Sequence, residues 1–185
     1  MIRNLFVEYR GKGSGNERWS SFSGVIRLER DYFIFARLAG IGGDVKDALV
    51  PPRGFPNDAA GAARDENFTW IDYAGKAINS SNCSPEDAAR WVATGKSHYD
   101  GTLSKMALPI SRKGEAEAEL VDIRKPAQVS NPDWHTHSWL STDEFEKAIE
   151  KTARPIPPTY QATIAAMRSL EASGFEVRCV FWFDN

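Results

Sequence analysis

The stretch that decides the fold is Phe175-Glu176-Val177-Arg178-Cys179-Val180-Phe181-Trp182-Phe183, at the end of a 185-residue chain. A strand with one solvated face alternates apolar and polar residues, but from Cys179 onward this stretch is apolar almost without interruption. Such a run is typical of a strand that is buried on both faces. The stretch therefore predicts a strand in the middle of a sheet.

The residues before this strand predict two helices. Residues 159–172 carry apolar side chains at helical spacing, and Gly174 can end the helix. Further upstream, Ser141-Thr142-Asp143-Glu144 has the pattern of a capping box, in which the serine accepts from the third residue on and the glutamate reaches back. A second helix is therefore expected to begin just after Ser141.

The N-terminal part of the chain predicts a hairpin followed by a helix. Residues 2–9 alternate and are rich in β-forming side chains, and residues 19–28 can supply the returning strand after a glycine-rich loop. The clearest helix of the chain covers residues 30–40, with Asp31 as its cap and Gly40 at its end.

These elements together predict the α+β class. A further helix is expected over residues 84–94, where Ser84 and Pro85 open it and Gly95 ends it. We expect one compact domain over residues 1–185, because the length suits one good hydrophobic core and no repeat or break in composition divides the chain. Its sheet is expected to be mixed or antiparallel, to contain both the N- and C-terminal strands, and to be packed by about four helices.

The composition excludes several classes of function. The chain has 42% hydrophobic and 26% charged residues, as a globular protein does, and its net charge of −2 gives no general attraction to nucleic acid or an anionic membrane. Because no apolar run is long enough to cross a membrane and the N-terminus has no signal peptide pattern, we expect a cytoplasmic protein. In that compartment Cys83 and Cys179 are expected to stay unpaired, and Cys179 reads as a core residue.

The rarest residues gather in Asp133-Trp134-His135-Thr136-His137-Ser138-Trp139-Leu140-Ser141. Because strand side chains alternate, an extended chain would place Asp133, His135 and His137 on one face, as a donor set that suits zinc or a similar metal. Positions 133–138 resemble the first metal motif of the polymerase-and-histidinol-phosphatase hydrolases, a likeness that implies metal-dependent hydrolysis. The chain departs from that family because no histidine follows His137. The alternative is a pair of ordinary hydrogen-bonding histidines.

The same stretch ends at the expected start of a helix. Free backbone N–H groups and the helix dipole favour an anionic group there, beside His135, Ser138 and Trp139. Residues 51–56, Pro-Pro-Arg-Gly-Phe-Pro, predict a stiff turn in which Arg53 can meet a carboxylate or phosphate with little ordering cost. The alternatives are a helix end that is capped without a ligand and a solvated arginine in a connector.

Four segments spread over nearly the whole chain form a wider pattern. They are the helix that ends in Leu38-Ala39-Gly40, then Pro52-Arg53-Gly54-Phe55-Pro56, the stretch from Asp133 to Ser141, and the C-terminal Val177 to Asn185. This pattern resembles a loosely defined family of small bacteriophage proteins of unassigned function. Position 137 is not part of that pattern, which leaves His135, Ser138 and Trp139 as the better site candidates. The resemblance implies an accessory protein of the host cytoplasm that binds a nucleotide signal or a host protein.

The first functional hypothesis is a non-enzymatic binder of a phosphate-bearing small molecule. Trp139 or Tyr32 would stack on a base of the ligand, and Arg53 would bind its phosphate. His135 and Ser138 would form hydrogen bonds with the polar edges of the ligand. The expected ligand-binding residues are Tyr32, Arg53, Asp133, His135, Ser138 and Trp139, with no catalytic residue, metal or cofactor. This hypothesis requires the turn around Arg53 and the histidine stretch to wall one recess.

Two alternatives belong to other classes. One is a metal-dependent hydrolase in which Asp133, His135 and His137 hold a metal whose bound water is the nucleophile. The other is a protein without a small-molecule site that inhibits a host protein through its surface. We expect a protein without enzymatic activity.

Overall fold

The computed structural model describes residues 2–13, 18–42, 47–67, 134–150 and 155–184, and the backbone of six short strands between residues 69 and 129. The chain divides into two compact units, residues 1–64 with 133–185 and residues 65–132, and each is described by itself. The single domain over residues 1–185 therefore stays a prediction. The helix expected at 84–94, Cys83 and Asp133 lie outside the described residues.

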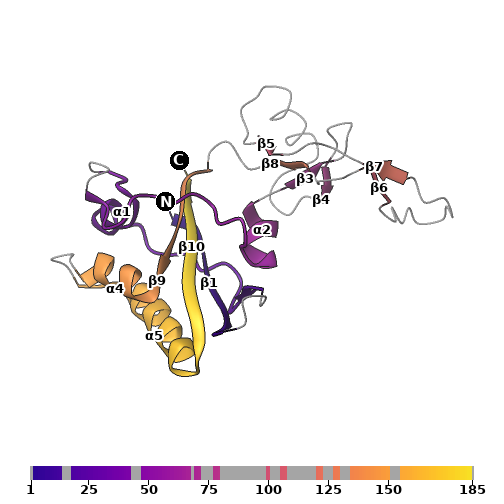
Figure 1. Ribbon diagram of the computed structural model, residues 1–185. Helices are drawn as coiled ribbons and strands as arrows, with labels where there is room; N and C mark the ends of the chain where they lie inside the picture. Colours follow the sequence, from indigo (N-terminus) through magenta and orange to yellow (C-terminus); the bar gives the residue numbers. More distant parts are fainter. Residues whose placement is uncertain are drawn as a thin grey trace. The chain divides into compact units, whose positions relative to one another are not determined.

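The first unit is built on a four-stranded antiparallel sheet with the strand order β2-β1-β10-β9. Its strands are β1 (Ile2–Gly11), β2 (Ser20–Ser21), β9 (Trp134–Ser141) and β10 (Phe175–Asp184). The prediction for the C-terminal strand is confirmed, because β10 lies between β1 and β9 (Figure 1). The sheet contains both the first and the last strand of the chain, as the sequence led us to expect, and the structure shows that these two strands are neighbours.

The two faces of the sheet follow the alternation of side chains along β10. Cys179, Phe181 and Phe183 point into the larger hydrophobic core, and Val180 and Trp182 point into a smaller core on the other face. All five side chains are fully buried. Burial on both faces explains why this strand has no polar alternation beyond residue 178.

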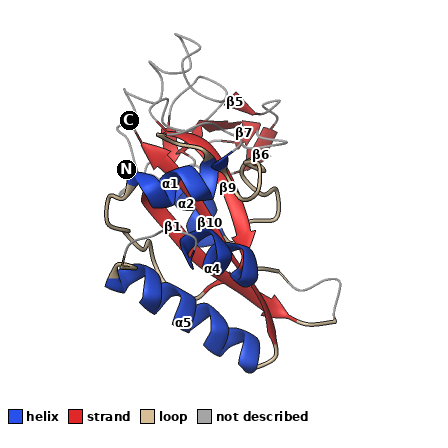
Figure 2. Cartoon of the chain, turned by 90° about the vertical axis from the view of Figure 1, so that its left-hand side faces the viewer, coloured by secondary structure: helices blue, strands red, loops and turns tan. Residues whose placement is uncertain are grey.

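Four helices occur among the described residues: α1 (Tyr32–Ala39), α2 (Gly61–Asn67), α4 (Thr142–Glu150) and α5 (Pro158–Ala172). The larger core joins the buried faces of α1, α4 and α5 to one face of the sheet (Figures 1 and 2). Ala63 of α2 belongs to the smaller core on the opposite face. The prediction of an α+β fold with about four helices is confirmed.

The predicted helix ends are present. Asp31 accepts hydrogen bonds from the backbone of Phe33 and Ile34, and Gly40 ends α1 with φ of 73°. At α4 the serine and glutamate bond reciprocally: Glu144 N donates to Ser141 Oγ at 3.3 Å, and Ser141 N donates to Glu144 Oε2 at 3.0 Å. The capping box read from the sequence therefore forms in the fold.

The second unit, residues 65–132, is described through short antiparallel strands. One sheet has the order β4-β3-β8-β5, formed by Ala77–Asn79, Thr69–Ile71, Ala127–Val129 and Tyr99–Asp100. The second pairs β6 (Lys105–Ala107) with β7 (Leu120–Asp122). The candidate site lies entirely within the first unit.

Candidate functional site

The face of the sheet opposite α4 and α5 changes from apolar to charged along its length. Phe6 pairs with Val180, and two residues further along β1, Glu8 pairs with Arg178. The next pair on this face is Arg10 with Glu176. Opposite charges that lie directly across a strand pair attract each other, so this half of the sheet carries two cross-strand ion pairs.

The deeper of the two ion pairs is buried. The Glu8 side chain is 0% exposed and that of Arg178 is 6% exposed, with 2.8 Å between Arg178 Nε and Glu8 Oε2. Arg178 also donates to the Asp58 side chain at 2.9 Å and to its carbonyl oxygen at 3.3 Å. The other oxygen of Glu8 accepts from the backbone N–H of Ala60 at 2.8 Å. These bonds hold Asp58 and Ala60, which precede α2, against the charged half of the sheet.

Arginine and tryptophan side chains alternate across this half of the sheet, and we call the set the arginine–tryptophan ladder. In order, its members are Arg10, Trp19, Arg178, Trp139 and Arg53. From each guanidinium carbon to the neighbouring ring centre the distances are 4.5, 3.9, 5.7 and 4.3 Å along the ladder. All four fall within the range of a cation–π contact, so the ladder orients three guanidinium groups on one surface.

The proline-rich turn docks on strand β9. The backbone N–H of Arg53 donates to Ser138 Oγ at 3.2 Å, and that of Gly54 donates to the His137 carbonyl at 3.0 Å. The guanidinium of Arg53 bonds the carbonyl of Trp139 at 3.1 Å and both oxygens of Glu144, at 2.8 and 2.6 Å. The turn and the histidine stretch therefore meet, whereas the binding hypothesis required more, namely that both segments wall one recess.

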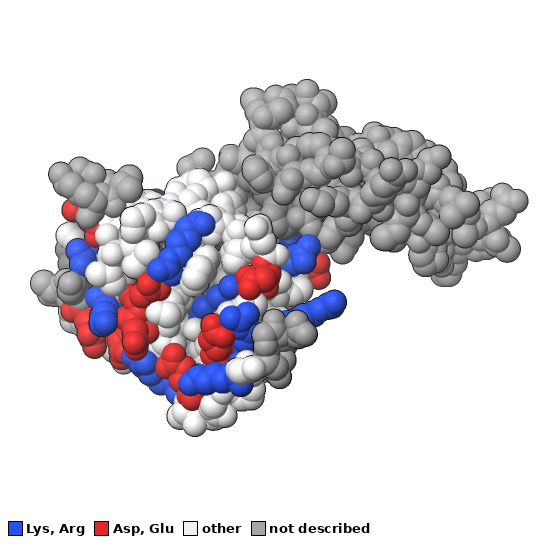
Figure 3. All heavy atoms as spheres, in the orientation of Figure 1, with Lys and Arg blue, Asp and Glu red and all other residues white. Residues whose placement is uncertain are grey.

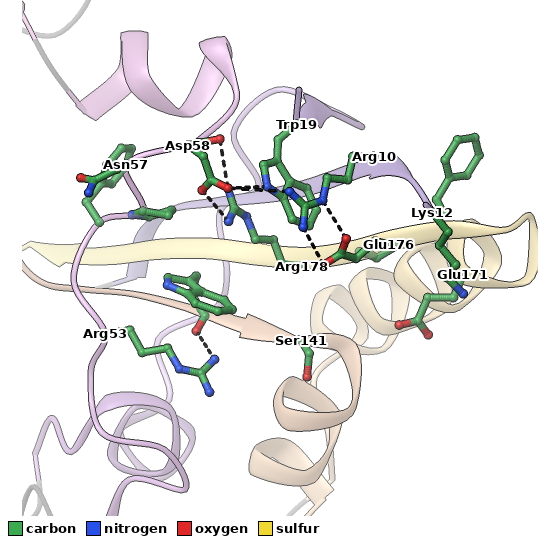
Figure 4. Close-up of a pocket in the computed structure, with 15 residues that line it drawn as sticks. Arg10, Lys12, Trp19, Arg53, Asn57, Asp58, Ser141, Glu171, Glu176 and Arg178 are labelled. Atoms are coloured by element: carbon green, nitrogen blue, oxygen red, sulfur yellow. Dashed lines mark hydrogen bonds and ion pairs between the residues drawn. The ribbon is translucent and has the colours of Figure 1, made fainter. Parts of the chain in front are cut away.

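A cleft of about 600 Å³ lies over the ladder and is the candidate site. Its lining includes all five ladder residues and, with them, Lys12, Phe55, Pro56, Asn57, Asp58, Ser141, Glu171, Phe175, Glu176 and Val177. Figure 4 shows Arg178 and Asp58 pointing toward each other, with Arg10 paired to Glu176 beside them. Four cations and three carboxylates line this space, so the site presents both charges to a ligand.

Two carboxyl groups beside the cleft are held by arginines. The hydrogen bond from Arg53 lowers the pKa of Glu144, and the hydrogen bond from Arg10 lowers the pKa of Glu176. Both stay ionised at neutral pH and fix the orientation of their arginines. Within the described part of the chain, Lys12 is a lining cation that makes no ion pair.

The carboxyl groups of Glu8 and Asp58 respond differently to the same arginine. Burial raises the pKa of Glu8, and the charge and hydrogen bond of Arg178 offset this only in part. Burial also acts to raise the pKa of Asp58, but the hydrogen bond and charge of Arg178 outweigh it and the pKa is lowered. Because its side chain is 58% exposed, Asp58 presents a carboxylate to the cleft, whereas Glu8 lies beneath it.

The structure brings together only part of the predicted ligand-binding set. Arg53 and Trp139 line the cleft, and Ser138 is buried beneath the turn that it holds. Tyr32 lies at the start of α1 with its ring against Phe35, and it does not line the cleft. His135 does not line the cleft either, and Asp133 lies outside the described residues.

The expectation that His135 and His137 share a face is wrong. Thr136 has φ of +51°. Phe181 pairs with Ser138 and Phe183 pairs with His135, so β9 advances by three residues over a distance in which β10 advances by two, which is a β-bulge. This bulge puts His135 against Phe183 in one core and His137 against Trp182 on the opposite face. The two imidazoles therefore cannot bind one metal from one side of the strand. Among the described residues there is no group of three or more potential metal ligands.

The residues of the site that were missed in the sequence include Arg10, Lys12, Trp19, Asp58 and Arg178. The available signal was charge at alternate positions in the two strands expected near the ends of the chain, namely Glu8 and Arg10 in β1 and Glu176 and Arg178 in β10. Buried charges are rare unless they are paired, so each of these strands implied a partner in the other. Nothing local to Trp19 or Asp58 marked either residue.

Comparisons of the chain with known protein families, with curated proteins and with solved structures found no match. The likeness to small bacteriophage proteins therefore stays a prediction. None of the helices in the described ranges has the length and apolar character needed to cross a membrane.

Proposed function

We propose that this protein binds a phosphate-bearing small molecule, of the nucleotide type, in the cleft over the arginine–tryptophan ladder. The observation that carries the proposal is the guanidinium of Arg53, which lies 4.3 Å from the centre of the Trp139 ring within the cleft. An arginine plane on a tryptophan offers a flat surface on which a base can stack.

The positive charges of the cleft suit the phosphate. Nη1 of Arg10 lies 3.9 Å from the Asp58 carboxylate, beyond hydrogen-bond distance, while Nε and Nη2 of Arg10 both donate to Glu176. Lys12 is exposed and lines the same cleft. These two cations can receive a phosphate without dismantling the ion pairs that orient the arginines.

The mixed charge of the cleft favours a small molecule over a long nucleic acid. On the described surface seen in Figure 3, basic side chains are interspersed with acidic ones, and they do not gather in one large patch. A long nucleic acid needs a continuous basic track because its affinity comes largely from many phosphate contacts. A ligand with one phosphate group needs only the few cations of the cleft.

Titration calorimetry with linear and cyclic mononucleotides tests the proposal, and quenching of tryptophan fluorescence provides a second readout. Lys12→Ala removes a phosphate contact, and we expect it to weaken binding about tenfold, since charge-assisted hydrogen bonds contribute this much. Arg53→Gln removes the guanidinium plane on Trp139 and should weaken binding about fivefold, because a cation–π contact contributes about 1 kcal/mol. Lys147→Ala is the matched control, because Lys147 is an exposed residue of α4 that does not line the cleft.

Two results would overturn the proposal. One is the absence of both heat and quenching for every nucleotide, which would leave a host protein as the candidate partner. The other is equal affinity of the wild-type, Arg53→Gln and Lys12→Ala proteins, which would place any bound nucleotide outside this cleft.

A further inference from the structure

Asp58 is a carboxylate in a cleft that is proposed to hold a phosphate. Its side chain is 58% exposed, and it accepts one hydrogen bond on each oxygen, from Nη1 of Arg178 and from Nε1 of Trp19, both at 2.9 Å. An ionised carboxylate has about four acceptor positions. Asp58 therefore keeps acceptor capacity on both oxygens after its protein partners are satisfied.

An ionised Asp58 determines which part of a ligand can lie beside it. The hydrogen bond and charge of Arg178 hold its pKa below the usual range, so at neutral pH the group accepts hydrogen bonds and does not donate them. A phosphate would be repelled there and is better placed near Lys12. The part of the ligand next to Asp58 must carry N–H or O–H donors, and two adjacent donors would match its two oxygens.

The common bases differ in the edge that they offer to a carboxylate. Guanine presents N1–H and its 2-amino group side by side, so both can donate to one carboxylate. Adenine and cytosine place a ring acceptor beside their amino group, and that acceptor would face the carboxylate unfavourably. Uracil offers one N–H between two carbonyl oxygens.

We infer that Asp58 makes the cleft selective for guanine nucleotides, through paired hydrogen bonds from N1–H and the 2-amino group. This inference rests on the proposed function, since it assigns the base of the same ligand. Arg53 and Trp139 supply the stacking surface, Lys12 the phosphate contact, and Asp58 the discrimination between bases.

The test compares the 5′-monophosphates of guanosine, inosine and adenosine on the wild-type protein. Inosine keeps N1–H but lacks the 2-amino group, so it removes one of the two proposed bonds. We expect guanosine monophosphate to bind at least about tenfold more tightly than adenosine monophosphate, with inosine monophosphate between them, because hydrogen bonds to a charged group contribute this much.

Two variants assign the preference to Asp58. Asp58→Asn keeps the size of the side chain but replaces one acceptor by a donor, and we expect it to lose the guanine preference while its affinity for adenosine monophosphate changes less than about twofold. Asp143→Asn is the matched control, because Asp143 is an exposed carboxylate of α4 that does not line the cleft. This variant should keep the preference.

The outcomes separate the two proposals. Equal affinity for guanosine and adenosine monophosphates overturns the selectivity of Asp58 and leaves the nucleotide site standing. A guanine preference that persists in Asp58→Asn also overturns it, because another group would then read the base. Binding of no nucleotide overturns both. If Asp58→Asn fails to fold because Arg178 loses a partner, Asp58→Glu takes its place, because it keeps the charge but displaces the carboxylate and should weaken the guanine preference. Equal affinities of the wild-type protein for the three nucleotides would still overturn the inference.

Discussion

The face of the sheet that carries the candidate site has two halves, and the same strands build both. In the apolar half, Phe6, Val180 and Trp182 are buried under Ala59 and Ala63, within the smaller core. In the charged half, the next positions along the same strands are an acidic and a basic residue, and these lie in or below a cleft. The step from one half to the other takes two residues on each strand.

The comparison shows how one sheet can provide both stability and a site. Apolar side chains are covered because burial removes them from water, whereas charged side chains must be paired or hydrated. Pairing Glu8 with Arg178 allows the sheet to continue beneath the cleft without an uncompensated charge. The apolar half therefore seals the unit, and the charged half leaves room for a ligand.

The largest expected effect on stability comes from truncating a buried side chain in the apolar half. Trp182 is fully buried and its ring contacts those of Phe6, Phe55 and His137. We expect Trp182→Ala to lower the free energy of unfolding by about 3–5 kcal/mol, measured by urea denaturation. The control is Trp139→Ala in the charged half, where the ring is only half-buried. An equal loss in the two variants would contradict the division into a sealed and an open half.

Breaking the buried ion pair should have the next largest effect. Arg178→Met leaves Glu8 buried without a cation, and we expect a loss of about 3 kcal/mol in the free energy of unfolding at neutral pH. The double variant Glu8→Leu with Arg178→Met removes both charges and should recover much of that loss. If the losses of the two substitutions simply add in the double variant, so that it is less stable than Arg178→Met, the two residues do not act as a pair.

The turn that forms one side of the cleft depends on Gly54. This residue has φ of +79°, with nothing within 4 Å of an added Cβ, so Gly54→Ala meets backbone strain and no clash. We expect it to cost about 1 kcal/mol in the free energy of unfolding. Gly24→Ala is the matched control, because Gly24 is equally uncrowded but does not adopt the left-handed conformation. Equal stability of the two variants would contradict the prediction, because the backbone at residue 54 would then accommodate alanine without strain.

The smallest effect concerns pH. The folded protein holds the pKa of Glu144 below its ordinary value of 4.5, so this group contributes stability above about pH 4.5 that is lost as the pH falls through the lower, folded-state pKa. We expect Glu144→Gln to cost about 0.5 kcal/mol at pH 7, as part-exposed ion pairs do, and less at pH 3. Thermal unfolding of both proteins at the two pH values measures the difference. A stability difference between the two proteins that grows toward pH 3 would contradict the lowered pKa of Glu144.

The histidine stretch shows where reading the sequence alone failed. Alternation in an ideal strand put His135 and His137 on one face, but the bulge at Thr136 separates them. Bulges depend on how a strand pairs with its neighbour, and no residue type in Trp134 to Ser141 signals this one. Arg53, in contrast, was recognised because its prolines restrict the turn locally.

The amino-acid sequence by itself determined the elements whose causes are local. These are the doubly buried strand β10, the capping box at Ser141 and the helix ended by Gly40, each specified by residues a few positions apart. The candidate site was decided only by the tertiary structure. Arg10, Arg53 and Arg178 become neighbours through the register of β1, β10 and β9 and the docking of a distant turn. Such contacts depend on how whole strands pair, and one extra residue in a strand can change that pairing. Local sequence patterns therefore do not predict them.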